Sequence, residues 1–107
     1  MLRNTTSTLE TQIAFFKEIR HDVSRLDEAR QGFVQLLSET NNADQKIEIY
    51  RNLSKIALRL DDIGHASQYL DLGEQLLDQV STTDNVYLFK IHQAEFYQYH
   101  SRSQSFH

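Results

Sequence analysis

The sequence predicts an all-α fold of about five helices, paired as antiparallel hairpins. Apolar residues recur at intervals of three, four and seven along most of the chain, which is the spacing of one helix face. Proline is absent and only three glycines occur, so a hairpin-rich β fold lacks its usual turn residues. At 107 residues, the chain fits a single domain.

The first two helices are expected to follow a disordered lead-in over residues 1–8, where no apolar periodicity is found. Thr8 is the expected N-cap of the first helix. A weak break is expected around Ser24 and Arg25. The second helix then begins with Asp27 and Glu28, because acidic side chains suit the positive end of the helix dipole.

Three further helices are separated by two clear loops and one tight turn. The loop over residues 38–44 ends at Asp44, the expected N-cap of the third helix, which reaches residue 60. Turn chemistry over residues 61–64 precedes a fourth helix over about 66–77. The loop over residues 81–84 leads to a last helix over about 85–100, and a polar tail over 101–107 is expected. The domain is thus expected over residues 9–100.

Composition excludes several classes of function. No cysteine occurs, which rules out disulfides, thiolate metal sites and a cysteine nucleophile, and three glycines cannot build a glycine-rich phosphate loop. The net charge of −4 argues against nucleic-acid or anionic-membrane binding as the main task. No apolar run is long enough to cross a bilayer, and the polar start lacks the apolar region of a secretory signal. We therefore expect a cytoplasmic protein.

Two stretches of the chain repeat with a lag of 37 residues, which places Ala29 over Ala66 and Phe33 over Leu70. Each stretch reads as a helix, a tight turn and a second helix. Neither helix could bury its apolar face alone, so stacked hairpins are the expected arrangement. A generic bundle of four or five helices, in which the echo is a coincidence, is the alternative.

The stretch from residue 47 to residue 78 resembles the tetratricopeptide (TPR) repeat family. Tyr50 and Leu53 stand at large positions of that family's first helix, and Ala66 and Gly73 stand at small positions of its second helix, where the two helices cross closely. The resemblance implies a short right-handed solenoid of stacked hairpins, with units over about 9–40, 44–80 and 85–100. In the first unit, Lys17 and Arg20 depart from the pattern.

A basic stripe on the third helix is the candidate binding site. Arg51, Lys55 and Arg59 follow one another at i, i+4 and i+8, with Asn52 beside them. By the TPR resemblance, the first helix of each unit lines a groove in which such residues hold a peptide carboxylate, and arginine can grip a carboxylate through two parallel hydrogen bonds. The alternative is a solvated face paired with nearby carboxylates, Glu48 and Asp62.

The last predicted helix carries aromatic residues around more than one face, and such a helix is expected to be buried on nearly all sides. Three arrangements would cover this helix: contact with a second copy of the chain, contact with a further helix of a longer array, or a central place in a compact bundle. The candidate self-association residues are five: Tyr87, Phe89, Phe96, Tyr97 and Tyr99.

Histidines suggest two further sites. His21 beside Asp22 would suit a helical phosphotransfer or signalling bundle, although an ordinary surface histidine is the simpler interpretation. His92 and Glu95 share one face of the last helix, but no second Glu-x-x-His motif completes a metal site. We expect no metal, no cofactor and no catalytic residue.

These observations favour a non-catalytic module that binds a protein or peptide segment, within a larger sensory or regulatory protein. The alternatives are the phosphotransfer or signalling bundle that uses His21 and a purely structural dimerisation domain.

Overall fold

The computed structural model describes the backbone of residues 5–104 and the side chains of residues 9–101. Within these residues the chain forms α-helices and short 3-10 turns and no strand. The all-α prediction is therefore confirmed for the described chain. The elements are α1 (Thr5–Ile19), η1 (Val23–Arg25), α2 (Leu26–Leu37), α3 (Ala43–Arg59), α4 (Ile63–Glu74), η2 (Leu77–Gln79) and α5 (Thr83–Gln104).

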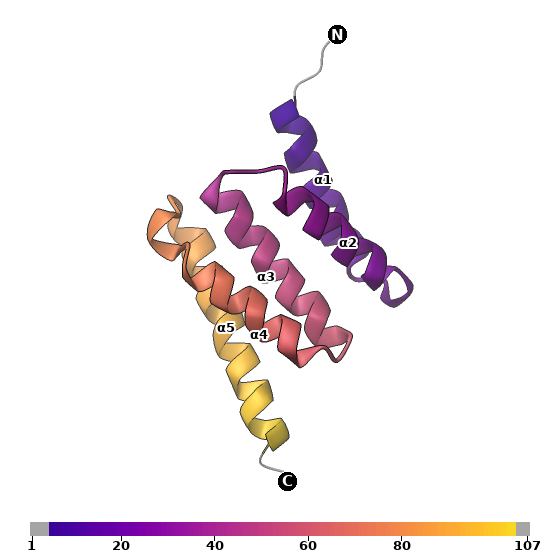
Figure 1. Cartoon of the computed structure of the whole chain (residues 1–107), viewed down its shortest axis with the longest axis vertical. Helices are drawn as coiled ribbons and strands as arrows, with labels where there is room; N and C mark the ends of the chain where they lie inside the picture. The colour runs from indigo at the N-terminus through magenta and orange to yellow at the C-terminus, as the bar shows by residue number, and fades with distance from the viewer. Residues whose placement is uncertain (1–4, 105–107) are drawn as a thin grey trace.

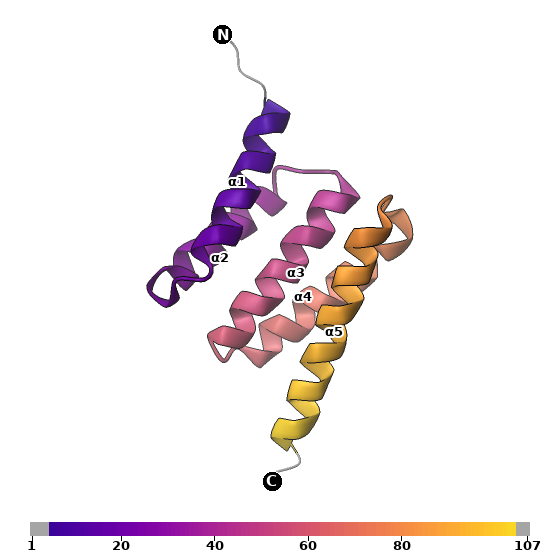
Figure 2. The ribbon, with the colours of Figure 1, turned by 180° about the vertical axis from the view of Figure 1, so that it is seen from behind.

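The helices lie in two layers of a flat molecule with principal extents of 58 × 34 × 19 Å. Helices α2 and α4 lie toward the viewer in Figure 1, and α1, α3 and α5 lie toward the viewer in the reverse view of Figure 2. Successive helices run antiparallel, with α3 at the centre. The residues of α1, α3 and α5 therefore share one face of the molecule.

The buried apolar residues of α3 are divided between two clusters of the core. Ile49, Leu53 and Ile56 pack into a cluster with α1 and α2. Ile47 and Ala57 pack into a second cluster with α4 and α5. Helix α3 thus joins the two halves of the core.

The aromatic residues of α5 are divided between the core and the surface. Phe89 is 0% exposed and Phe96 is 3% exposed, and both belong to the cluster that α3 and α4 complete. Of the five residues predicted for self-association, these two are therefore occupied by the chain's own core. Tyr87, Tyr97 and Tyr99 remain exposed.

The missing side chain of Gly73 leaves space that a ring of α5 fills. A Cβ atom added to Gly73 would lie 2.4 Å from Cε1 of Phe89 and 3.1 Å from Cδ1 of Ile47. The sequence predicts that this small position faces Tyr50 and Leu53, but Leu53 packs in the cluster around α1 and α2. The aromatic ring that fills the space comes from the following helix.

Several helix boundaries differ from those predicted. Helix α1 begins at Thr5, so Thr8 lies inside it, while residues 1–4 of the predicted lead-in lie outside the described residues. Asn42 caps α3, since its Oδ1 accepts a hydrogen bond from the backbone N–H of Gln45 at 2.9 Å. Asp44 was the predicted cap, but it sits in the first turn and bonds elsewhere. Helix α5 runs from Thr83 to Gln104, and residues 105–107 of the predicted tail lie outside the described residues.

The turn predicted at residues 61–64 is confirmed only at Asp61 and Asp62, because α4 begins at Ile63 and ends at Glu74 instead of spanning about 66–77. The backbone of this turn explains why α3 ends there. Asp61 has a φ of 62°, in the left-handed region. The N–H of Asp62 donates to the carbonyl oxygen of Ala57 at 2.8 Å, and the N–H of Asp61 donates to that of Leu58 at 3.0 Å. These two bonds form a Schellman motif, and Asp62 then caps α4 by accepting from the N–H of His65.

Candidate functional site

Four cationic side chains of α3 and the end of α1 lie close to one another. Arg51, Lys55 and Arg59 come from α3, as the i, i+4, i+8 spacing predicts, and Arg20 follows directly after the last residue of α1. Helices α1 and α3 share the layer that lies toward the viewer in Figure 2. The Nε of Arg20 donates to Oδ1 of Asn52 at 2.7 Å, and Nη1 of Arg59 donates to the carbonyl oxygen of Arg20 at 3.0 Å. We call these four residues the cation cluster.

The carboxylates that could neutralise the cation cluster are paired with other groups. Glu48 accepts from Nζ of Lys17 at 2.7 Å. Asp62 lies 2.7 Å from Nδ1 of His65 and 3.6 Å from Nη1 of Arg30. No ion pair found among the side chains of residues 9–101 includes a member of the cation cluster. Among the described side chains, Glu48 and Asp62 therefore form no ion pair with the stripe, although the charge of Glu48 opposes the lowering of the pKa of Arg51 by burial.

The positive charges of the cluster act on one another. Burial lowers the pKa of Arg20, and the charges of Arg51 and Arg59 lower it further. Burial also lowers the pKa of Lys55; Arg20 and Arg51 add to this effect, and the carboxylate of Glu95 opposes it. A group that holds its proton less firmly here than in water is in an environment that disfavours positive charge. An anion placed in this cluster would reverse that effect.

His92 lies beside the cation cluster, on α5, and it is only 6% exposed. Burial lowers its pKa to about 3, and the charges of Lys55, Arg51 and Arg20 contribute in that order. Its imidazole is therefore neutral at neutral pH. Its Nε2 atom is buried and has no hydrogen-bond partner within the described chain. Buried polar atoms are usually paired, so an unpaired one needs an explanation.

A cavity of about 270 Å³ opens between α3 and α5, next to this histidine. Six residues line it: Lys55, Leu58, Arg59, His92, Glu95 and Tyr99. His92 is the most buried of the six, and Arg59, Glu95 and Tyr99 are exposed. The cavity is therefore lined by a buried, neutral histidine, by two members of the cation cluster and by the carboxylate residue Glu95.

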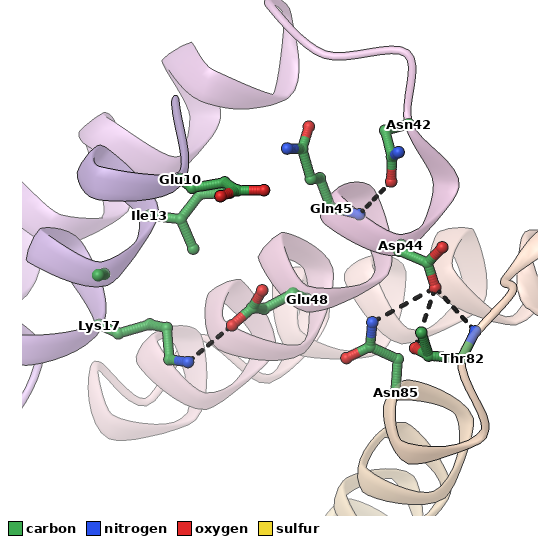
Figure 3. Close-up of a pocket in the computed structure, with 10 residues that line it drawn as sticks. Glu10, Ile13, Lys17, Asn42, Asp44, Gln45, Glu48, Thr82 and Asn85 are labelled. Atoms are coloured by element: carbon green, nitrogen blue, oxygen red, sulfur yellow. Dashed lines mark hydrogen bonds and ion pairs between the residues drawn. The ribbon is translucent and has the colours of Figure 1, made fainter. Parts of the chain in front are cut away.

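A second, polar cleft of about 410 Å³ lies on the same face, between α1, the start of α3 and the start of α5 (Figure 3). One of its lining residues is Asp44, at the side of the cleft next to α5, whose carboxylate accepts hydrogen bonds from Oγ of Ser81 at 2.6 Å and from the N–H of Thr82 at 3.2 Å. These bonds, that of Ser81 first, lower the pKa of Asp44 to about 2. Asp44 belongs to α3 and its partners belong to the loop before α5. These hydrogen bonds therefore hold the start of α5 against the start of α3.

The other residues predicted from sequence are dispersed. His21 lies exposed in the turn after α1, beyond the helix end at Ile19 and away from the cation cluster's hydrogen bonds. His92 and Glu95 face each other with Nδ1 and Oε1 3.7 Å apart, and no group of three potential metal ligands occurs in the described chain.

Sequence reasoning missed Arg20 and His92 as parts of this site. Arg20 could have been found, because it breaks the apolar pattern of α1, as does Lys17. Both polar residues face α3, Lys17 toward Glu48 and Arg20 toward Asn52. His92 carried no such signal, since its unpaired nitrogen depends on how α5 packs against α3.

Comparison with known proteins yields no match to a protein family, to a curated protein or to a solved structure. Within residues 5–104, no helix combines the length and the apolar character needed to cross a membrane. The function must therefore be argued from the site.

Proposed function

We propose that this chain is a non-catalytic, TPR-like helical-repeat module that binds an acidic peptide segment of a partner protein. The observation that carries the proposal is the cation cluster, in which Arg20, Arg51, Lys55 and Arg59 meet without an ion pair to any carboxylate of the described side chains. Two nearby carboxylates offset part of this charge, Glu95 at Lys55 and Glu48 at Arg51. Arginine suits this task because its planar guanidinium group can bind a carboxylate through two hydrogen bonds.

The charge distribution supports a binding site for an acidic segment over an ordinary solvated surface. The chain is acidic overall, with a net charge of −4, yet four of its eleven Lys and Arg residues crowd onto one face. Their mutual repulsion and partial burial cost stability. Carboxylates of a bound ligand would relieve this repulsion, which adds favourable free energy to binding.

The arrangement of helices supports a groove-like binding face. Helices α1, α3 and α5 share one layer while α2 and α4 lie in the other, as in stacked hairpins whose first helices face the ligand. The rigid layer limits the conformational entropy lost on binding. The place of the module in a larger, cytoplasmic sensory or regulatory protein is part of the proposal and follows from the TPR resemblance.

Charge reversal tests the proposal. Binding of a short fluorescent Glu-rich peptide is measured by anisotropy for the wild type, for Arg51→Glu and for Lys90→Glu. The two variants change the net charge equally, but Lys90 lies near Glu74 on the side of α5 that faces α4. We expect Arg51→Glu to weaken binding by about ten- to a hundredfold, the value of one or two charge-assisted hydrogen bonds.

Lys90→Glu should change the affinity less than threefold, and circular dichroism should show equal helix content for all three proteins. Equal affinities of the two variants would mean that the cation cluster does not bind the peptide. Added salt should weaken wild-type binding strongly, since the contacts are between charges.

Self-association through α5 is a second candidate, favoured by the large apolar side chains that α5 leaves at the surface. They are Tyr87, Leu88, Ile91, Tyr97 and Tyr99, each between 38% and 65% exposed. Exposed apolar patches commonly mark contact surfaces. Light scattering over a concentration series tests it: a dimer that Tyr87→Ser weakens is expected, and a monomer at all concentrations would contradict it.

A further inference from the structure

We propose that the cavity between α3 and α5 selects a segment in which one apolar residue stands between acidic residues and a basic residue. The apolar side chain enters the cavity, the acidic residues lie on the α3 side, and the basic residue lies on the α5 side beside Glu95. This inference rests on the proposed function, because the cation cluster anchors the acidic part. It goes further by naming the order of residues in the ligand and by making Glu95 a specificity-determining residue.

The cavity lies where α3 and α5 diverge. The hydrogen bonds of Asp44 hold the starts of the two helices together, and the helices separate toward the end of α5 (Figure 2). The lining residues come from the last turns of α3 and from the middle of α5 onward. Because the two walls belong to different helices, a bound side chain meets α3 on one side and α5 on the other.

The surface inside the cavity is almost wholly hydrocarbon, although four of its six lining residues are of ionisable types. Leu58 and the ring of Tyr99 contribute apolar atoms. Lys55 and Arg59 contribute their stems, because long charged side chains lay their stems along apolar surface and keep their charged ends in water. Nε2 of His92 has almost no accessible surface, so it takes no part.

The size and the lining of the cavity together suit a single apolar side chain. Its volume of about 270 Å³ lies below the range of about 300–1,000 Å³ that is typical of pockets for drug-sized ligands. A leucine of the bound segment would exchange contact with water for contact with this hydrocarbon surface.

The charges around the cavity differ in sign between its two sides. Lys55 and Arg59 line the α3 side, and the rest of the cation cluster extends from there toward the end of α1. Among the described side chains, the charged residue that α5 adds to the lining is Glu95, which is 64% exposed. A segment that crosses the cavity from α3 to α5 therefore meets positive charge first and negative charge second.

The carboxylate of Glu95 is available to a basic residue of the ligand. It lies 3.7 Å from Nδ1 of His92, but burial lowers the pKa of His92 to about 3, so the imidazole is neutral at neutral pH and leaves the charge of Glu95 in place. Glu95 also opposes the lowering of the pKa of Lys55 by burial, yet the two form no ion pair among the described side chains. A lysine or arginine at this position is attracted, and a glutamate is repelled.

Three peptides test the order of residues. The reference peptide carries a block of Glu residues, then a Leu and then a Lys; the second peptide has Ser for the Leu, and the third has Glu for the Lys. Each peptide is made in both chain directions, because either direction can place the charges in this order, and the tighter of the two is compared. Affinities are measured by isothermal calorimetry for the wild type, for Glu95→Lys and for the control Asp71→Lys. Asp71 is exposed on α4, in the other layer, and its substitution changes the charge equally.

We expect the wild type to bind the reference peptide about tenfold more tightly than the Ser peptide, the low end of the effect of burying a leucine side chain. It should bind the reference peptide about threefold more tightly than the Glu peptide, because an exposed ion pair is exchanged for a repulsion. Glu95→Lys should reverse this second preference, and Asp71→Lys should keep it.

The outcomes separate the inference from the function beneath it. Equal wild-type affinities for the Leu and Ser peptides would overturn the apolar site. A wild-type preference for the Glu peptide, or the same Lys-to-Glu ratio in the wild type and in Glu95→Lys, would overturn the role of Glu95. Each of these results leaves the proposed function standing, because the acidic block is still bound, whereas absence of binding for all three peptides at millimolar concentration would overturn both. Should Glu95→Lys fail to fold, Glu95→Gln decides, because loss of the charge should remove the preference for Lys.

Discussion

Replacing each glycine by alanine tests how closely the helices approach one another. Alanine stabilises a helix by about 0.4–1 kcal/mol relative to glycine wherever space permits. At Gly64 nothing lies within 4 Å of the added Cβ, so Gly64→Ala should gain this amount. At Gly73 the Cβ would lie 2.4 Å from the ring of Phe89, which is 0% exposed and cannot move aside.

Overpacking of a filled core costs about 1–3 kcal/mol, which exceeds the gain in helix propensity. Gly73→Ala should therefore lose up to about 2 kcal/mol in the free energy of unfolding, measured by urea titration with circular dichroism. Gly32→Ala should fall between the other two. Its Cβ would lie 2.2 Å from Cζ of Phe16, but that ring is only partly buried and can turn outward. A Gly73→Ala protein as stable as Gly64→Ala would refute the packing of α4 against α5.

Four further predictions concern turns and charges. Asp61→Gly should raise the free energy of unfolding by about 0.5–1 kcal/mol in urea titrations, because glycine adopts the φ of 62° without a Cβ penalty; no gain would contradict the left-handed turn. Asp44→Asn should lower the thermal midpoint at pH 5, and the difference should vanish as the pH falls from about 4 through about 2. The pKa of Asp44 is depressed to about 2, so its stabilisation is present above the unfolded pKa and is lost as the folded carboxylate gains a proton. Lys55→Gln should leave the thermal midpoint unchanged or higher while it weakens binding of the Glu-rich peptide, since it relieves repulsion from Arg20; a large loss of stability would show that Lys55 is structural. A double-mutant cycle on Lys17 and Glu48, whose side chains are 41% and 24% exposed, should give a coupling of about 0.2–1 kcal/mol; zero coupling would show that the 2.7 Å pair is absent in solution.

Most helices could be predicted from the sequence, because apolar periodicity, turn residues and helix caps depend on residues that are close together in the chain. The break near Ser24 and the turn at Asp61 were both foreseen in this way. The boundary of α3 was misplaced because Asn42 and Asp44 are equally good caps by type. Which of them caps the helix depends on the distant loop at Ser81, whose hydroxyl bonds Asp44.

The site was foreseen only where its residues share one helix. The stripe of Arg51, Lys55 and Arg59 follows from helical spacing alone. Arg20 and His92 join it through the packing of α1 and α5 on α3, which residue types do not specify. The division of the α5 aromatics into buried Phe89 and exposed Tyr87 likewise depends on which side of α5 meets α4.

The central claim, that the face of α1, α3 and α5 binds an acidic segment, is tested most directly by mapping amide chemical shifts during titration with the Glu-rich peptide. The account predicts saturable shifts concentrated at Arg20, Arg51, Asn52, Lys55 and His92, with α2 unchanged. Shifts confined to α2 and α4, or to the outer side of α5 around Tyr87, would contradict it.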